Sequence, residues 1–132
     1  MVTEELASVI VTNGLGTLGT DLFLHVAPNE PDDLVVLVEY AGDDPEYIQE
    51  TVDVHLEAPR IQVGVRNTSA NLARAKAEDI YRALMRIRNE SIQGTRYMWC
   101  RPVDTPSLVG RDDSNRFLVT VNFRVKKELT NA

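Results

Sequence analysis

The sequence contains little cysteine and no long apolar run. A single cysteine, Cys100, in 132 residues excludes an internal disulfide framework and a zinc cluster built on cysteines. No apolar run approaches the roughly 20 residues that a membrane-spanning helix needs, so we expect no membrane association. Residues 1–9 contain no Lys or Arg, so we expect no secretory signal and a cytoplasmic site of synthesis.

Basic residues are missing from the first part of the chain. Residues 1–59 contain thirteen Asp and Glu and no Lys or Arg, whereas residues 60–132 contain seven acidic and all fourteen basic residues. The two parts therefore carry −13 and +7, which together give the net charge of −6. This asymmetry predicts either two opposite patches that steer head-to-tail contact between copies, or interleaved strands whose charges cancel.

The order of apolar residues predicts one domain of the α+β class. Alternation from Phe117 to Val125 is typical of a strand, and helical spacing from Ala73 to Ile87 is typical of a long amphipathic helix. We expect an antiparallel or mixed β-sheet with one long helix packed on one face and a short N-terminal helix. The expected elements of domain 1–132 are a short helix at about 3–13, strands at about 21–26, 33–41, 50–58, 60–67, 96–103 and 116–127, the long helix at about 69–90, a turn at 43–47, an interruption at Pro59 and a polar loop at 104–115.

The segment 14–19 spells the dinucleotide-binding pattern G-x-G-x-x-G, with Glu39 twenty positions later. A Rossmann unit needs a strand before these glycines and a helix of several turns after them, where the pyrophosphate binds. Here the following residues alternate like a strand, and Pro28 and Pro31 interrupt the chain soon afterwards. We therefore interpret the segment as a turn between a helix and a strand, and Glu39 as a carboxylate at a strand end.

Other residues offer only weak indications of chemistry. Asp53, His55 and Glu57 share one strand face and could hold a metal, but no second cluster completes a coordination set. Cys100 is more simply a packed thiol than a nucleophile. Eleven arginines against three lysines suit phosphate recognition, while the net charge of −6 opposes general nucleic-acid affinity. We expect no catalytic residue, no cofactor and no metal.

The chain from Pro59 onward resembles a known family. "APRIQVGVRNTSANLARAKAEDIYRALMRI" and "RPVDTPSLVGRDDSNRFLVTVNFRV" are similar to the minor capsid and tail-completion proteins of tailed bacteriophages. That family has a strand P-x-I-Q-V-x-V-R, a helix with an I-Y-x-x-L core, and a loop P-x-x-L-G-R-D, into which this sequence inserts Val109. The matching residues are Pro59, Gln62, Val63, Arg66, Ile80, Tyr81, Leu84, Pro106, Gly110, Arg111, Asp112, Asn122 and Phe123.

The resemblance implies a structural virion protein, similar to the tail terminator that caps the tail tube as a ring and joins the tail to the head. It implies a homo-hexameric ring, with the tail-tube protein and head–tail connector proteins as partners. DNA would pass through the channel without specific binding, and the chain would reside in the tail or neck of the virion after assembly in the host cytoplasm. The alternatives are a head-side completion protein and a soluble α+β ligand-binding or enzymatic domain.

The resemblance also gives candidate interface residues in the polar loop and beside it. An ion pair in such a loop would join subunits of a ring, or the loop would be a solvated turn with weak pairs. The candidates are Arg66, Arg111, Asp112, Asp113 and Arg116.

Overall fold

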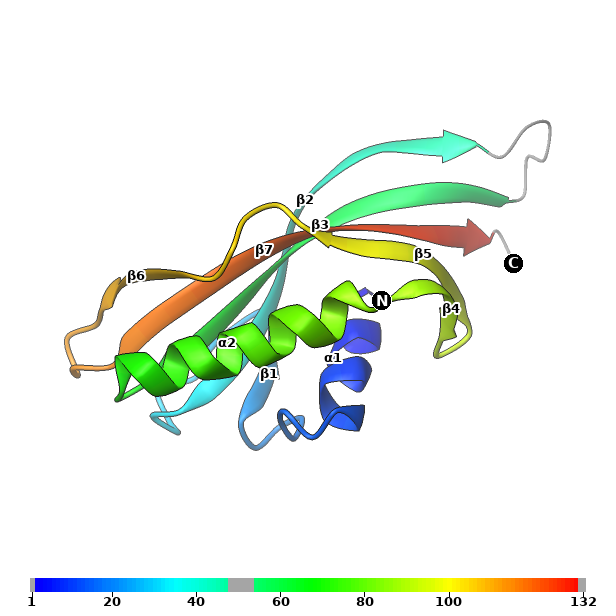
Figure 1. The fold of residues 1–132 in the computed structure, drawn as a ribbon. Helices are drawn as coiled ribbons and strands as arrows, with labels where there is room; N and C mark the ends of the chain where they lie inside the picture. The colour runs from blue at the N-terminus through cyan, green and yellow to red at the C-terminus, as the bar shows by residue number, and fades with distance from the viewer. Residues whose placement is uncertain (1, 48–53, 131–132) are drawn as a thin grey trace.

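The computed structural model describes residues 2–47 and 54–130, which are arranged around one seven-stranded β-sheet (Figure 1). The sheet order is β1-β2-β3-β7-β5-β4, and β6 pairs with the first part of β7. β1 and β2 run parallel and the other pairs are antiparallel, so the sheet is mixed. The strands are β1 (Leu22–Leu24), β2 (Leu34–Tyr47), β3 (Val54–Asn67), β4 (Arg88–Ile92), β5 (Thr95–Pro102), β6 (Ser107–Arg111) and β7 (Phe117–Thr130).

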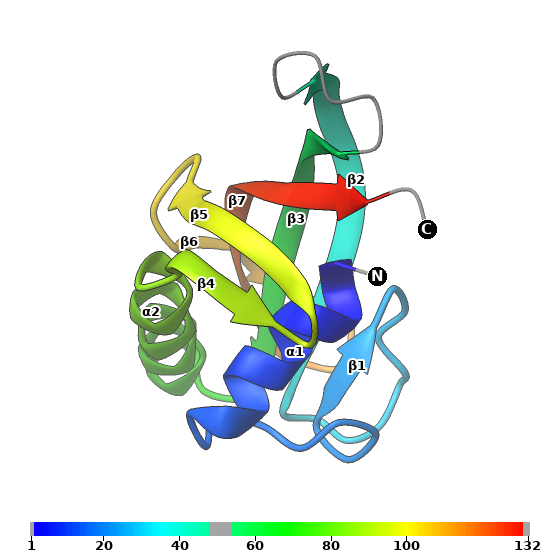
Figure 2. The same ribbon diagram turned by 90° about the vertical axis from the view of Figure 1, so that its right-hand side faces the viewer.

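Two helices, α1 (Val2–Thr12) and α2 (Ala70–Met85), lie on the same side of the sheet (Figures 1 and 2). α2 contacts β3, β5, β7 and α1. Ser69 caps the start of α2, since its hydroxyl accepts a hydrogen bond from the backbone N–H of Leu72 at 3.3 Å. Neither helix has the length and apolar character needed to cross a bilayer. The hydrophobic core lies between these helices and the sheet.

The predicted α+β arrangement, with one long helix packed on one face of the sheet, was wrong. The structure is mostly mixed β-sheet with two short helices, since α1 has 11 residues and α2 has 16. α1 also buries Leu6 and Ile10 in the same core, so both helices form the layer beside the sheet. The sequence pattern overstated the length of the second helix because a buried residue after its end continues the apolar stripe.

That residue is Ile87, which is buried just beyond the end of α2. The next residues form β4, which turns into β5 through Gln93 and Gly94. These two residues have φ angles of 49° and 84°, in the left-handed region that tight hairpin turns use. β4 has four exposed residues and no alternation of apolar side chains, so its sequence did not indicate a strand.

The strands also differ from their expected bounds. Residues 43–47, expected to form a turn, belong to β2, which accommodates them through register shifts between residues 39 and 41 and between 43 and 46. Pro59 lies within β3, so the segments 50–58 and 60–67 do not form two strands, although residues 50–53 lie outside the described part. The expected loop 104–115 contains β6.

A polar contact fixes α1 against the β4–β5 hairpin. The Glu5 carboxylate is buried and accepts hydrogen bonds from the hydroxyl of Tyr97 at 2.7 Å and from the hydroxyl of Thr95. Burial, and then the hydrogen bond to Glu5, raise the pKa of Tyr97. A buried carboxylate needs such donors, so α1 is held by specific contacts as well as by apolar packing.

Candidate assembly interface

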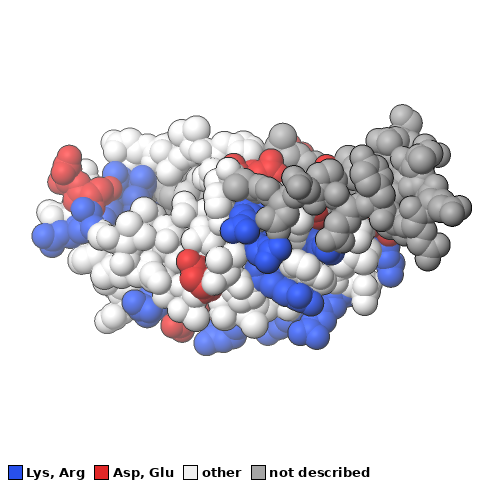
Figure 3. Space-filling model, turned by 90° about the horizontal axis from the view of Figure 1, so that it is seen from above, with Lys and Arg blue, Asp and Glu red and all other residues white. Residues whose placement is uncertain are grey.

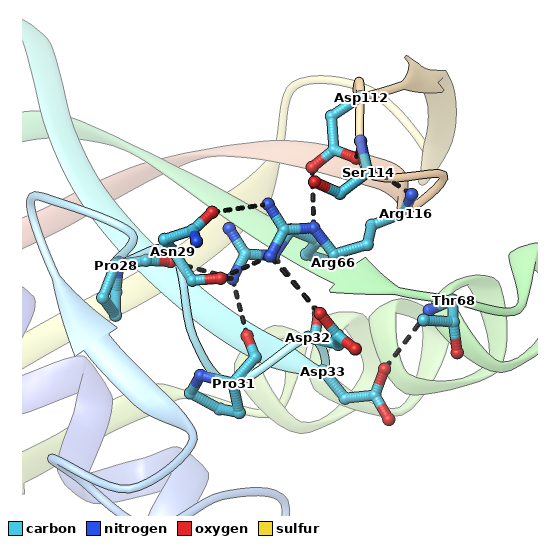
Figure 4. Close-up of polar contacts among 10 residues, drawn as sticks. All are labelled: Pro28, Asn29, Pro31, Asp32, Asp33, Arg66, Thr68, Asp112, Ser114 and Arg116. Carbon is cyan, nitrogen blue, oxygen red and sulfur yellow. Dashed lines mark hydrogen bonds and ion pairs between the residues drawn. The ribbon is translucent and has the colours of Figure 1, made fainter.

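Arg66, near the end of β3, joins this strand to the loop that precedes β2 (Figure 4). Desolvation by burial, followed by the charge of Arg116, lowers the pKa of Arg66. A guanidinium has five N–H donors in a planar fork, which suits it to cross-link several carbonyl groups. Its Nη2 donates to the carbonyl oxygens of Pro28 at 2.8 Å, Asn29 at 3.2 Å and Pro31 at 2.6 Å, and its Nε donates to that of Asp32 at 3.2 Å.

Arg116, just before β7, binds the same loop (Figure 4). The residue is only 6% exposed. Its Nε donates to Asp112 Oδ2 at 2.8 Å, and its Nη1 lies 3.5 Å from Asp32 Oδ1. Its Nη2 donates to Asn29 Oδ1 at 3.2 Å, and its Nη1 also donates to the Asn29 carbonyl. Arg116 therefore connects the turn before β7 to the loop before β2.

Asp112 closes the turn between β6 and β7. Its Oδ1 accepts hydrogen bonds from the backbone N–H groups of Ser114 and Arg116, both at 2.9 Å. The backbone hydrogen bond from Arg116, with the side-chain bond from Arg116 and the bond from Ser114, lowers the pKa of Asp112. An aspartate that satisfies backbone donors in this way fixes the conformation of a turn.

The structure thus brings three of the five candidate residues together, in what we call the tip cluster. The tip cluster spans about 90 sequence positions but occupies one end of the sheet, where β2, β3 and β7 begin or end. Its members are Asn29, Asp32, Arg66, Asp112 and Arg116.

The other two candidates, Arg111 and Asp113, are exposed at this end. The Arg111 guanidinium carbon lies 5.9 Å from the centre of the Phe117 ring, within the range of a cation–π contact. Because the tip cluster fixes the turn beneath them, these two side chains are presented to solvent from an ordered backbone.

Strand β6, like β4, is an element that sequence reasoning missed. All five of its residues are exposed, including Leu108 at 46% and Val109 at 63%. Among the described residues, β6 pairs only with β7, which leaves its second edge without a neighbouring strand. Exposed strand edges with apolar side chains are typical sites of association with another chain. The adjacent Leu108 and Val109 were the signal for it in an otherwise polar segment.

The glycine segment 14–19 connects α1 to β1. Gly14 and Gly19 have φ angles of 71° and 85°, and the Thr17 N–H donates to Asp21 Oδ1 at 2.7 Å. A helix precedes the segment and a three-residue strand follows it, which is the reverse of the order in a dinucleotide-binding unit.

The weaker chemical candidates have ordinary structural contacts. Glu57 pairs with Lys127 at 3.2 Å, while Asp53 lies outside the described residues. Within residues 2–47 and 54–130, no three His, Cys, Asp or Glu side chains are grouped to hold a metal. Burial raises the pKa of Cys100 to about 12, so this thiol is protonated at neutral pH and is a poor nucleophile.

Comparison with known proteins gives a matching family and solved structures of similar fold. The model of a family described as bacteriophage tail terminator protein matches residues 9–129. A solved structure described as the virion of a native gene transfer agent particle contains a chain with the same fold, with a TM-score of 0.61 and 15% identity. The match covers 94% of this chain and 84% of that chain. A search of curated proteins gives no match.

Proposed function

This chain belongs to the bacteriophage tail terminator protein family, and we propose that it caps the tail tube as a ring and joins the tail to the head. The family makes it a structural protein of the phage tail, and the earlier resemblance to tail-completion proteins is thereby confirmed. The ring, its hexameric order and its docking to the head are the proposed part.

The observation that carries the proposal is the exposed strand β6 beside the ordered tip cluster. A ring of identical subunits needs a heterologous contact, in which one surface of a copy binds a different surface of the next. β6 offers such a surface, with exposed apolar side chains and a second edge that no other described strand covers. Arg111 and Asp113 lie at its end and would supply charged contacts at the rim.

The proposed partners follow from the position of a cap. One face of the ring would contact the tail-tube protein, and the opposite face would contact head–tail connector proteins. DNA would pass through the channel without sequence-specific binding. The subunits would assemble in the host cytoplasm and then reside in the tail or neck of the virion.

Light scattering of the purified chain tests the ring directly. We expect a mass near six times 14.8 kDa, alone or in the presence of tail-tube protein. A chain that stays monomeric at all concentrations, and has no effect on the length of tubes assembled in its presence, would contradict the proposal.

Electron micrographs of particles that lack the protein test its position. Abnormally long or headless tails are expected of a missing terminator. Heads that leak DNA and carry no tails would instead support the alternative of a head-side completion protein.

A further inference from the structure

Three arginines lie side by side on the face of the sheet that the helices leave uncovered. The antiparallel register places Arg124 of β7 opposite Arg60 of β3 on one side and opposite Arg101 of β5 on the other. Residues directly opposite on neighbouring strands share one face and lie about 5 Å apart. Phe123 and Val125, on either side of Arg124, are fully buried beneath the helices, so the arginines are on the outer face. We call Arg60, Arg101 and Arg124 the arginine row.

An aromatic ring and further polar side chains extend this row. The Arg101 guanidinium lies 4.2 Å from the centre of the Trp99 ring, and Lys126 Nζ lies 5.8 Å from it. Farther along the same face, Gln62 donates to the side chain of Asn122 at 3.2 Å. Seen from this side, Lys and Arg side chains gather in the middle of the molecule (Figure 3). The outer face is therefore polar and locally basic.

Like charges placed directly opposite on a sheet destabilise it. The arginine row puts three positive charges on adjacent strands, in a chain whose net charge is −6. Arg60, Arg124 and Lys126 have interactions within the chain, and the five N–H donors of each guanidinium allow the arginines to bind phosphate in addition to these contacts.

We propose that the arginine row binds the sugar–phosphate backbone of double-stranded DNA. An arginine that contacts a DNA phosphate stays partly hydrated, so little desolvation is needed. The evenly spaced phosphates of a DNA strand also match a row of cations. Single arginines are common at protein–protein interfaces, but burying three neighbouring guanidinium groups in the core of one would require the desolvation of all three charges. Contacts to the sugar–phosphate backbone do not distinguish one base sequence from another. This binding is therefore compatible with the passage of DNA of any sequence. That the DNA is the genome passing the ring rests on the proposed function.

Fluorescence anisotropy with a labelled random-sequence duplex tests the row. The wild-type chain is compared with Arg101→Gln/Arg124→Gln at salt concentrations from about 50 to about 200 mM. We expect the variant to bind roughly tenfold more weakly at low salt, and the slope of log affinity against log salt to fall by about 2 per subunit. Arg101→Gln alone is a second, milder variant, with an expected fall of about 1.

The matched control is Arg74→Gln/Arg82→Gln, which removes two exposed arginines from α2 with the same change in net charge. Arg82 pairs with Asp79 at 3.3 Å on the helix surface, so its loss should leave DNA binding close to that of the wild type. Thermal unfolding followed by circular dichroism establishes that each variant is folded.

Several outcomes would overturn the inference. One is that the wild-type chain does not bind the duplex. Another is that the row variant and the control lose DNA affinity equally. A row variant that loses oligomer mass but keeps its DNA affinity would assign the row to contact with a second copy. By contrast, a monomeric wild type whose DNA binding depends on the row would keep this inference and contradict the ring.

Discussion

The two faces of β7 differ completely in chemistry, although they come from one strand. Val119, Val121, Phe123 and Val125 are fully buried against the helices. The residues between them, such as Asn122 and Arg124, lie on the uncovered face and are polar or charged. Successive side chains of a strand point to opposite faces, so a single sequence can serve packing and surface chemistry at alternate positions.

This difference separates the residues that hold the fold from those that are available for contacts. Side chains on the covered face fill a close-packed interior, where each lost methylene is felt. Side chains on the uncovered face, and on β6 beside it, can change with little effect on packing. The tip cluster lies between these extremes, since its side chains are polar and only Arg116 among them is buried. Substitutions should therefore fall into three classes of effect.

The largest change in the free energy of unfolding is expected from a substitution on the covered face. Phe123→Ala should lower the free energy of unfolding by about 3–5 kcal/mol, because it removes a fully buried ring and leaves a cavity. Urea unfolding at neutral pH measures this. Thr120→Ala on the uncovered face of the same strand is the control, with an expected change within about 0.5 kcal/mol. Equal effects at both positions would refute the difference between the faces.

Secondary structure could be predicted from the sequence in some regions and not in others. The outcome again depends on whether an element has one buried and one exposed side. Alternation over residues 117–125 is readable because every second side chain meets the helices. The end of α2 was not readable, because the apolar stripe continues into Ile87, which the fold buries from a different backbone conformation. Alternation could not reveal β6 either, since a wholly exposed strand has no buried side to impose it.

The contacts of the candidate interface residues were not readable from the sequence, for a related reason. Loop composition and family resemblance pointed to Arg66 and Arg116 as interface residues. The structure places both in contacts within the chain, with carbonyl groups more than 30 positions away in sequence. No local pattern signals such long-range hydrogen bonds. The arginine row was missed because it depends on strand register, which brings together residues from three separate segments.

The next largest effect is expected in the tip cluster. Arg116→Ala should lower the free energy of unfolding by about 2 kcal/mol, because it removes charged hydrogen bonds and leaves the Asn29 carbonyl without that donor. Arg111→Ala, at the exposed end of β6, is the matched control and should change stability by less than about 0.5 kcal/mol. A change in the Arg116 variant as small as in the control would mean that the cluster does not stabilise the fold.

A smaller effect is expected at Asp112, and it should be lost in acid. The pKa of Asp112 is lowered in the folded chain, so its stabilising contribution is complete above the ordinary carboxyl pKa of 3.8 and is lost as the pH falls through the lower folded value. The stability difference between the wild type and Asp112→Asn should thus be constant above about pH 5 and shrink below about pH 4. Urea midpoints at stepped pH measure it, with Asp113→Asn as the neighbouring control. A difference that stays constant down to acid pH would contradict this role.

The smallest effect on folding is expected from Arg111→Glu, which should instead weaken assembly. Arg111 is exposed at the end of β6, so reversing its charge should change the free energy of unfolding by less than about 0.5 kcal/mol. At a contact between subunits the same reversal replaces attraction by repulsion, and light scattering should show a lower mass at a given concentration. Arg82→Glu on α2 reverses another exposed charge and should leave the mass unchanged. If Arg111→Glu chains assemble as the wild type does and give tails of normal length, this end of β6 is not part of the ring contact.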